Sequence, residues 1–306
     1  MRVLFWGTPD FAVPPLRALL GEGMDVCGVV TQPDKPTGRH RTLTPPPVKQ
    51  VALDEGLPVY QPARAKDDDW FETLQSIHPD LSIVVAYGHI LPKRVIDLPT
   101  HGTLNIHASL LPALRGAAPI QAAIREGRTE TGVSIMRMVP ALDAGPVLLT
   151  STTPIADDET YGELQLRLSE LGALAVIEAM ALLEMAAATE TPQNELLATY
   201  APKVDRDTVR IDWTQPARAV SNAIRAYDPK PGAFSTLHGS DVKLFGPSPA
   251  PGVGLPGEVL ATTPSLVIAC GDGALALRDV QPAGKRRMPS EEWHRGRGIQ
   301  VGDRLA

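Results

Sequence analysis

Apolar and polar positions along the first half of the chain form blocks that predict strands and helices in turn. Short apolar runs bounded by glycine, proline or polar residues are typical of buried strands. Such runs lie at Arg2–Trp6, Val26–Thr31, Val59–Tyr60, Leu81–Ala86, Thr103–Ile106, Val133–Met138 and Val147–Thr152. Helices are expected from about Phe11, over Asp67–Ile77, over Ala117–Arg125 and over Asp157–Ala188. This alternation predicts an α/β fold with a mainly parallel, doubly wound sheet.

The pattern changes after residue 188. Residues 189–207 are polar and irregular, which predicts a linker. The following strands are short and separated by glycine and proline: Val209–Trp213, Ala233–Leu237, Val242–Phe245, Gly257–Leu260, Ser265–Ala269 and Ala274–Val280, with one helix at Ala217–Ala226. Many short strands in about 100 residues predict a small antiparallel barrel. We therefore expect two domains, 1–188 and 208–306.

Composition places the chain among globular proteins of the cytosol. Of its 306 residues 43% are hydrophobic and 21% are charged, which excludes intrinsic disorder. No apolar run approaches the ~20 residues that cross a membrane, and the first residues turn polar after Trp6, unlike a signal peptide. Cys27 and Cys270 lie far apart in apolar surroundings, so we expect core thiols rather than a disulfide or a zinc site.

Charge is unevenly divided between the two predicted domains. The net charge is −6. Residues 1–188 carry 15 Lys and Arg against 22 Asp and Glu, whereas residues 201–306 carry 14 against 11. Lys285, Arg286 and Arg287 form the densest basic group of the second domain. A basic domain attached to an acidic one is compatible with a polyanionic partner, and chance surface charge is the alternative.

Several common chemistries are disfavoured by the motifs that the sequence lacks. The turn after the first strand, Gly7–Asp10, has one glycine where a dinucleotide site needs G-x-G-x-x-G, and no Walker A motif occurs. NAD and ATP are therefore not expected. No His-x-x-x-His or Cys-x-x-Cys spacing occurs, so no metal site is expected either.

Polar side chains with catalytic potential cluster where one strand ends. Asn105 and His107 are two residues apart, so in an extended chain both point to the same side. An amide and an imidazole together can polarise a carbonyl and move a proton. Asp143, before Gly145-Pro146, could pair with His107 and favour its charged form. The alternatives are that the histidine is structural and that the aspartate only initiates a turn, which is common before Gly-Pro.

The long loop Gln32–Pro45 follows the second strand and has a basic tip at Arg39 and Arg41. Long loops at the ligand edge of a sheet often carry function. A solvated loop without a role is the alternative.

Taken together, several segments closely resemble the methionyl-tRNA formyltransferase family. They are Phe5–Ala12, Thr31–Pro36, Asn105–Pro112, Arg115–Gln121 and Leu142–Gly145, followed by Thr199–Lys203, Ile211–Trp213, Ile224–Tyr227 and Gln281–Lys285. The Asn-x-His-x-Ser-Leu-Leu-Pro segment alone marks only the wider folate-dependent formyltransferase superfamily. The C-terminal segments and the basic loop narrow the resemblance from this superfamily to the family that acts on methionyl-tRNA. The chain departs from the family pattern at Ala113-Leu114 and at Lys230.

The resemblance implies a Rossmann-like catalytic domain and an OB-like C-terminal barrel that binds tRNA. It implies transfer of a formyl group from 10-formyltetrahydrofolate, as co-substrate, to the α-amino group of methionyl-initiator-tRNA, by a cytoplasmic enzyme that we expect to be monomeric. By the same resemblance Asn105, His107 and Asp143 are catalytic. Folate contacts are implied for Ser109, Leu110, Leu111, Pro112, Tyr87, Gly88 and Ile90. A contact to tRNA is implied for Arg39, and contacts are expected for Arg41, Lys285, Arg286 and Arg287.

Other functions remain open at this point. A formyltransferase acting on a small amine, such as a nucleotide sugar or glycinamide ribonucleotide, would share the first domain but would need neither the basic loop nor the basic second domain. A non-catalytic tRNA-binding protein would need no Asn-x-His pair with an aspartate. A nucleotide-dependent oxidoreductase is disfavoured by the missing glycine fingerprint.

Overall fold

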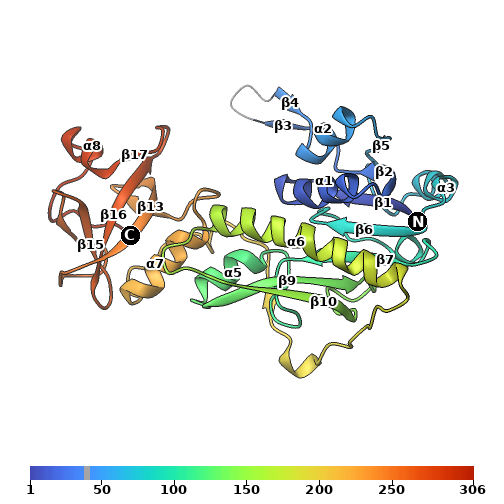
Figure 1. The fold of residues 1–306 in the computed structure, drawn as a ribbon. Coiled ribbons are helices and arrows are strands. Elements are labelled where there is room, and N and C mark those ends of the chain that lie inside the picture. Colours follow the sequence, from blue (N-terminus) through green and yellow to red (C-terminus); the bar gives the residue numbers. More distant parts are fainter. Residues whose placement is uncertain (38–41) are drawn as a thin grey trace. The chain divides into compact units, whose positions relative to one another are not determined.

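The structure is a computed structural model that describes residues 1–37 and 42–306 (Figure 1). The chain divides into two compact units, and each unit is assembled from several segments. The first unit consists of Met1–Gly116, Gly132–Thr153 and Gln165–Tyr200. The second unit consists of Ala117–Thr131, Pro154–Leu164 and Ala201–Ala306.

A seven-stranded sheet forms the centre of the first unit, in the order β10-β9-β7-β6-β1-β2-β5 (Figure 1). The strands are β1 (Arg2–Gly7), β2 (Asp25–Val30), β5 (Val59–Tyr60), β6 (Leu81–Val85), β7 (Thr103–His107), β9 (Glu130–Arg137) and β10 (Val147–Pro154). The five strands from β5 to β7 are parallel, and β9 is antiparallel to β7. The predicted α/β class with a mainly parallel sheet is confirmed.

Apolar runs without alternation explain why the central strands are buried on both faces. Residues 3–6 of β1 have no exposed surface, and every residue of β6 is buried. Helix α6 (Tyr161–Glu184) lies across one face of the sheet (Figure 1). Its Gly172 lets it approach closely, because a Cβ there would lie 3.0 Å from a methyl carbon of Ile106 in β7. Its Ser169 hydroxyl donates to the carbonyl of Phe11 at 2.6 Å.

The loops after three parallel strands meet at the carboxyl edge of this sheet. The hydroxyl of Thr8, after β1, donates to the carbonyl oxygen of Tyr87, after β6, at 2.9 Å. The side-chain amide of Gln32, after β2, donates to the same oxygen at 3.2 Å. Ligands of open α/β sheets bind at this edge, and Asn105 and His107 lie at the end of β7.

The remaining elements of the first unit are short. They are η1 (Asp10–Ala12), α1 (Val13–Gly21), β3 (Lys35–Thr37), β4 (Thr42–Thr44), α2 (Pro47–Asp54), α3 (Asp68–Ile77), α4 (Lys93–Ile96), β8 (Arg115–Gly116) and η2 (Glu195–Leu197). The short strand β11 (Tyr200–Ala201) lies where the first unit ends. The segment predicted as one loop, Gln32–Pro45, instead contains the antiparallel pair β3 and β4, in which Lys35 faces Thr44. Arg39 and Arg41 lie outside the described residues.

The second unit is built on a six-stranded antiparallel sheet. Its strands are β12 (Phe234–Leu237), β13 (Ser240–Ala250), β14 (Val259–Ala261), β15 (Leu266–Ala269), β16 (Ala274–Pro282) and β17 (Met288–Pro289). The order is β12-β13-β16-β15-β14, and β17 pairs with β16. Helix α7 (Ala217–Ala226) packs against β13 and against α5 (Pro119–Arg125), and α8 (Ser290–Arg295) packs against β16. The predicted change to short antiparallel strands is confirmed.

One predicted strand of the second unit is wrong. Val209–Trp213 forms turns with a single bridge from Arg210 to Phe234. The alternating side chains Val209, Ile211 and Trp213 are nevertheless buried, and the indole N–H of Trp213 donates to Ser235 at 2.9 Å. The alternation therefore marks burial on one side of the segment rather than a place in the sheet.

Candidate active site

His107 and Asp143 are brought together from distant parts of the first unit. Nδ1 of His107 lies 3.8 Å from Oδ2 of Asp143, and both side chains are largely buried, with 6% and 15% of their surface exposed. The other ring nitrogen, Nε2, lies 3.0 Å from the carbonyl oxygen of Leu114. A carbonyl oxygen only accepts, so Nε2 carries a proton whether the ring is neutral or charged. Nδ1 is therefore the nitrogen that can exchange a proton next to Asp143.

Asn105 lies on β7 with one residue between it and His107, and the pairing of β7 with β9 is regular over both positions. The side chains of Asn105 and His107 consequently point to the same side of the sheet. Asn105 is half-buried, and its amide makes no hydrogen bond to any residue that the structure describes. The amide N–H groups are thus available to a ligand beside the imidazole.

The segment after β7 is a tight loop whose polar groups are used internally. The buried Ser109 hydroxyl donates to the carbonyl of Ala113 at 2.6 Å. Ser134 of β9 donates its hydroxyl to the carbonyl of Ser109 and accepts from the amide of Leu111. Ser109 therefore shapes the loop, while Leu110, Leu111 and Pro112 remain half-exposed.

The carboxylate of Asp143 is fixed by backbone on one side. Its Oδ2 accepts the amide N–H of Gly116 at 2.8 Å. Asp143 itself has a φ of +48°, a left-handed conformation that is uncommon outside glycine. Gly145 follows in a space without room for a side chain, because a Cβ there would overlap the carbonyl oxygen of Arg137. This loop therefore has one narrow conformation, which presents Asp143 to His107.

Three further residues, which no sequence motif marks as functional, border this loop. Gln193 donates its amide to the carbonyls of Asp143 and Gly145, and it accepts from the guanidinium of Arg115. Arg115 in turn forms a paired contact with Glu195 at 2.8 and 2.9 Å. This contact raises the pKa of Arg115 and lowers the pKa of Glu195. Gln193 and Glu195 belong to the polar segment that reads as a linker, so no local pattern marks them.

The three residues expected to contact folate after β6 differ in exposure. Tyr87 is buried, and its ring meets Trp6 edge-on at 5.2 Å between centroids. Burial raises the pKa of Tyr87 to about 12. Gly88 is exposed, and 87% of the Ile90 surface is exposed. Gly88 and Ile90 are therefore accessible to a ligand, whereas Tyr87 supports the loop from the core.

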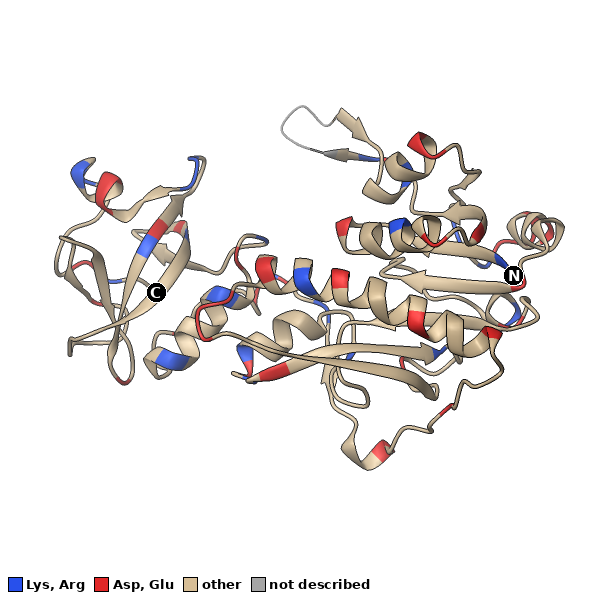
Figure 2. Ribbon diagram, in the orientation of Figure 1, with Lys and Arg blue, Asp and Glu red and all other residues tan. Residues whose placement is uncertain are grey.

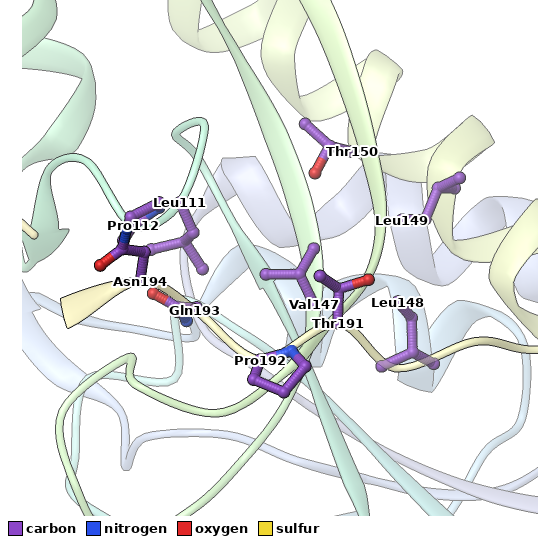
Figure 3. Close-up of a pocket in the computed structure, with 10 residues that line it drawn as sticks. All are labelled: Leu111, Pro112, Val147, Leu148, Leu149, Thr150, Thr191, Pro192, Gln193 and Asn194. Atoms are coloured by element: carbon purple, nitrogen blue, oxygen red, sulfur yellow. The ribbon is translucent and has the colours of Figure 1, made fainter. Parts of the chain in front are cut away.

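A pocket of about 430 Å³ lies beside the Ser109–Pro112 loop (Figure 3). Its lining combines this loop, the start of β10 and the segment 191–194: Leu111, Pro112, Val147, Leu148, Leu149, Thr150, Thr191, Pro192, Gln193 and Asn194. Asn105, His107 and Asp143 do not line it. The pocket thus shares the loop with the candidate site but does not contain the side chains that could perform chemistry.

The expected basic residues of the second unit fall into two groups. They follow β16 and precede β17, in a unit whose Lys and Arg positions are marked in Figure 2. Lys285 and Arg286 are exposed. Arg287 pairs with Asp228 at 2.9 Å and with Asp279 at 3.0 Å, and its guanidinium lies 4.0 Å from the centre of the Phe245 ring. Lys285 and Arg286 are open to a partner, while Arg287 is engaged within the unit.

The part of the chain that the structure describes has neither a metal-binding cluster nor a membrane-spanning helix. It holds no group of three or more His, Cys, Asp and Glu residues placed to bind a metal ion. None of its helices is long and apolar enough to cross a membrane.

Two sequence models of the formyl transferases match this chain. The model described as formyl transferase matches residues 1–180, and the model described as formyl transferase, C-terminal domain, matches residues 203–298. The fold and these matches define the class as the formyl transferases.

Curated relatives show to which family of formyl transferases the chain belongs. The methionyl-tRNA formyltransferase of Methylococcus capsulatus is 48% identical over 96% of this chain and 96% of its own length. That of Geobacillus thermodenitrificans is 45% identical over 99% of this chain and 97% of its own length. The chain belongs to the methionyl-tRNA formyltransferase family.

Solved structures share the fold at lower identity. WlaRD, described as a sugar 3N-formyl transferase, has a TM-score of 0.69 at 17% identity, over 94% of this chain and 99% of its own. HypX from Aquifex aeolicus in complex with tetrahydrofolic acid has a TM-score of 0.65 at 24% identity, over 95% of this chain. This chain spans about half the length of HypX, 46% of it.

Proposed function

We propose that this chain formylates the α-amino group of methionyl-initiator-tRNA with 10-formyltetrahydrofolate, and that Asn105, His107 and Asp143 perform the transfer. The observation that carries this assignment is the pairing of His107 with Asp143 beside the free amide of Asn105. Relatives that are 42–48% identical over almost the whole chain and are named methionyl-tRNA formyltransferase support the acceptor.

The acceptor amine needs little activation. An α-amino group has a pKa of about 7.7–8.0, so a useful fraction is neutral near pH 7. The enzyme must hold this nitrogen against the formyl carbon and stabilise the negative charge that develops on the formyl oxygen. The folate supplies the formyl group on a nitrogen that leaves with a proton. The half-exposed Leu110, Leu111 and Pro112 and the accessible Gly88 and Ile90 would offer apolar contacts to the folate.

The three catalytic side chains have different roles in this reaction. The amide of Asn105 donates to the formyl oxygen, where negative charge develops. Nδ1 of His107 carries the proton that it shares with the reacting centre, since Nε2 is held by the Leu114 carbonyl. Asp143 stabilises the charged imidazole and accepts the proton that the attacking amine releases. A new bond forms between the amine nitrogen and the formyl carbon, and the bond from that carbon to the folate nitrogen breaks. The folate nitrogen takes up the proton of His107 Nδ1 as it leaves, and the proton that Asp143 received from the amine then returns to Nδ1.

We further assign catalysis to residues 1–188 and tRNA binding to residues 208–306, with 189–207 between them. Lys285 and Arg286 are both exposed and are therefore open to phosphate contacts. Arg287 would act beside them by holding the turn. Arg39 and Arg41 of the basic loop are proposed to contact the acceptor end of the tRNA.

The deciding experiment is a transfer assay with three acceptors. Methionyl-initiator-tRNA, an amino-sugar nucleotide and glycinamide ribonucleotide are each offered with 10-formyltetrahydrofolate, and the formylated product is measured. We expect kcat/KM for the charged tRNA to exceed the others by several orders of magnitude. Comparable transfer to a small amine, with none to tRNA, would replace the proposed acceptor by that amine.

A further inference from the structure

The linker segment 189–200 is part of the first unit and is hydrogen-bonded into it at several points. Thr191 pairs with Val147, the first residue of β10, through two bonds of 2.9 Å between amide and carbonyl groups. Thr199 accepts the amide of Leu114 on its hydroxyl and the amide of Arg115 on its carbonyl. The segment therefore connects the loop that follows His107 with the loop that carries Asp143.

Gln193 is the centre of this connection, because both ends of its amide are used. Its oxygen accepts from Nε and Nη2 of Arg115 at 3.0 and 2.8 Å. Its nitrogen donates to the carbonyl oxygens of Asp143 and Gly145 at 2.8 and 2.7 Å. A guanidinium only donates and a carbonyl only accepts, so the amide satisfies its neighbours in one orientation alone.

The guanidinium that orients Gln193 is itself held on its remaining side. Arg115 is 2% exposed, and its two terminal nitrogens face the two carboxylate oxygens of Glu195. Glu195 lies two residues after Gln193 and is 67% exposed. The linker thus contributes two side chains that enclose the fork of Arg115 and fix it in place.

The hydrogen bonds from Gln193 end on the strained loop that carries Asp143. A residue with a φ of +48° has a left-handed conformation that is unfavourable outside glycine, and it persists where its surroundings hold it. The two bonds from Gln193 hold the carbonyl groups on both sides of Ala144. The carboxylate of the same loop accepts the amide of Gly116, the residue after Arg115. Gln193 therefore holds the backbone of the Asp143 loop, and the amide of Gly116 holds the Asp143 carboxylate.

We propose that Gln193 is a positioning residue for the formyl transfer. Gln193 fixes the Asp143 loop so that the carboxylate faces Nδ1 of His107. Because Gln193 belongs to segment 189–200, this segment supports catalysis and does not merely connect the two domains. This inference rests on the proposed roles of His107 and Asp143. A misplacement of about 1 Å at such a site lowers the rate by up to about 100-fold.

The test compares two variants of Gln193 with a control from the same segment. Gln193→Glu keeps the size and an acceptor for Arg115 but removes both donors and places an oxygen against the carbonyls of Asp143 and Gly145. Gln193→Ala removes all four bonds. Asn194→Ala is the matched control, because among the described residues its exposed side chain bonds only to the amide of Leu196, as the N-cap of η2.

We expect both Gln193 variants to lower kcat about 10- to 100-fold while KM for tRNA and for the folate stays within about twofold. The ¹⁵N shifts of the His107 ring, which report its charge and tautomer, should move toward those of Asp143→Asn. The control should retain wild-type kcat and wild-type shifts. Wild-type kcat and ring shifts in folded Gln193→Glu would overturn the proposal, and so would equal losses in the control.

The ring shifts also separate this proposal from the function on which it rests. If the wild-type chain transfers no formyl group to charged tRNA, the proposed function fails. The effect of Gln193→Glu on the His107 ring then still decides whether Gln193 positions Asp143. If transfer is normal and the ring shifts of Gln193→Glu equal those of the wild type, the positioning role alone fails.

Discussion

Removal of the Arg287 side chain should destabilise the second unit through a buried carboxylate. Only 6% of the Asp228 side chain is exposed, and Arg287 contacts it at 2.9 Å, while the same guanidinium contacts Asp279 and lies over Phe245. In Arg287→Ala, the buried carboxylate of Asp228 loses this partner. Loss of one partner of a buried pair costs about 3–5 kcal/mol.

The expected cost is smaller here, because one third of the Arg287 side chain is exposed and solvent screens the pair. Loss of the ion pair with Asp228 should cost about 2 kcal/mol, and loss of the contact with the Phe245 ring should cost about 0.5–1 kcal/mol more. Arg287→Ala should therefore lower the free energy of unfolding by about 2–3 kcal/mol. Arg286→Ala, in the exposed neighbour, should change it by less than about 0.5 kcal/mol.

Urea unfolding measures these changes, and a double-mutant cycle with Asp228→Asn isolates the pair. Asp228→Asn should cost clearly less in the Arg287→Ala background than in the wild type, because the unpaired charge is then removed. Equal costs in the two backgrounds would refute the reasoning. Filter binding over a salt series gives the functional contrast. Arg286→Ala should reduce the slope of log affinity against log salt by about 0.7–0.9 if it contacts one phosphate.

The remaining predictions concern the candidate site and one thiol. Asn105→Ala should lower kcat by about 10²–10³ through loss of a donor to the formyl oxygen, and a folded variant with wild-type kcat would exclude that role. His107→Ala combined with Asp143→Asn should cost little more than either change alone, as single-turnover rates will tell. Gly145→Ala should lower kcat and stability together, since its Cβ overlaps the Arg137 carbonyl; unchanged thermal unfolding would contradict this. Burial raises the pKa of the Cys270 thiol from 9.0 to about 11, so native alkylation at pH 8 should be about 100-fold slower than in urea, by mass spectrometry.

The central sheet was readable from sequence because its strands are buried on both faces. A buried parallel strand needs an uninterrupted apolar run, as in Leu81–Val85, and such a run has few other interpretations. Most strands of the second unit also follow from the sequence, since glycine or proline bounds them. Strand β13 is the exception, because it continues through Gly246, Pro247 and Pro249. Val209–Trp213 was misread because alternation reports which side of a segment is buried, and not whether another strand pairs with it.

Within the site, side chains close in sequence were predictable and their supports were not. Asn105 and His107 share a strand, so their common side follows from the period of two. The loops around Asp143 depend on Gln193, which is 50 residues away in the chain, and on its contact with Arg115, 78 residues away. A polar side chain in an irregular segment has the same local pattern whether it meets water or a buried guanidinium.

The placement of residues 191–199 within the first unit determines where the chain can be recombined with a relative. The domain boundary at 188, expected from sequence, would take Thr191, Gln193, Glu195 and Thr199 from the donor of the C-terminal half. A chimera joined there would set a foreign Gln193 and Glu195 against the native Arg115. A junction after Tyr200 keeps the hydrogen-bonded set from a single parent. When hybrid enzymes of this family are made, segment 191–199 should therefore come from the same parent as the first unit, although its sequence resembles a dispensable linker.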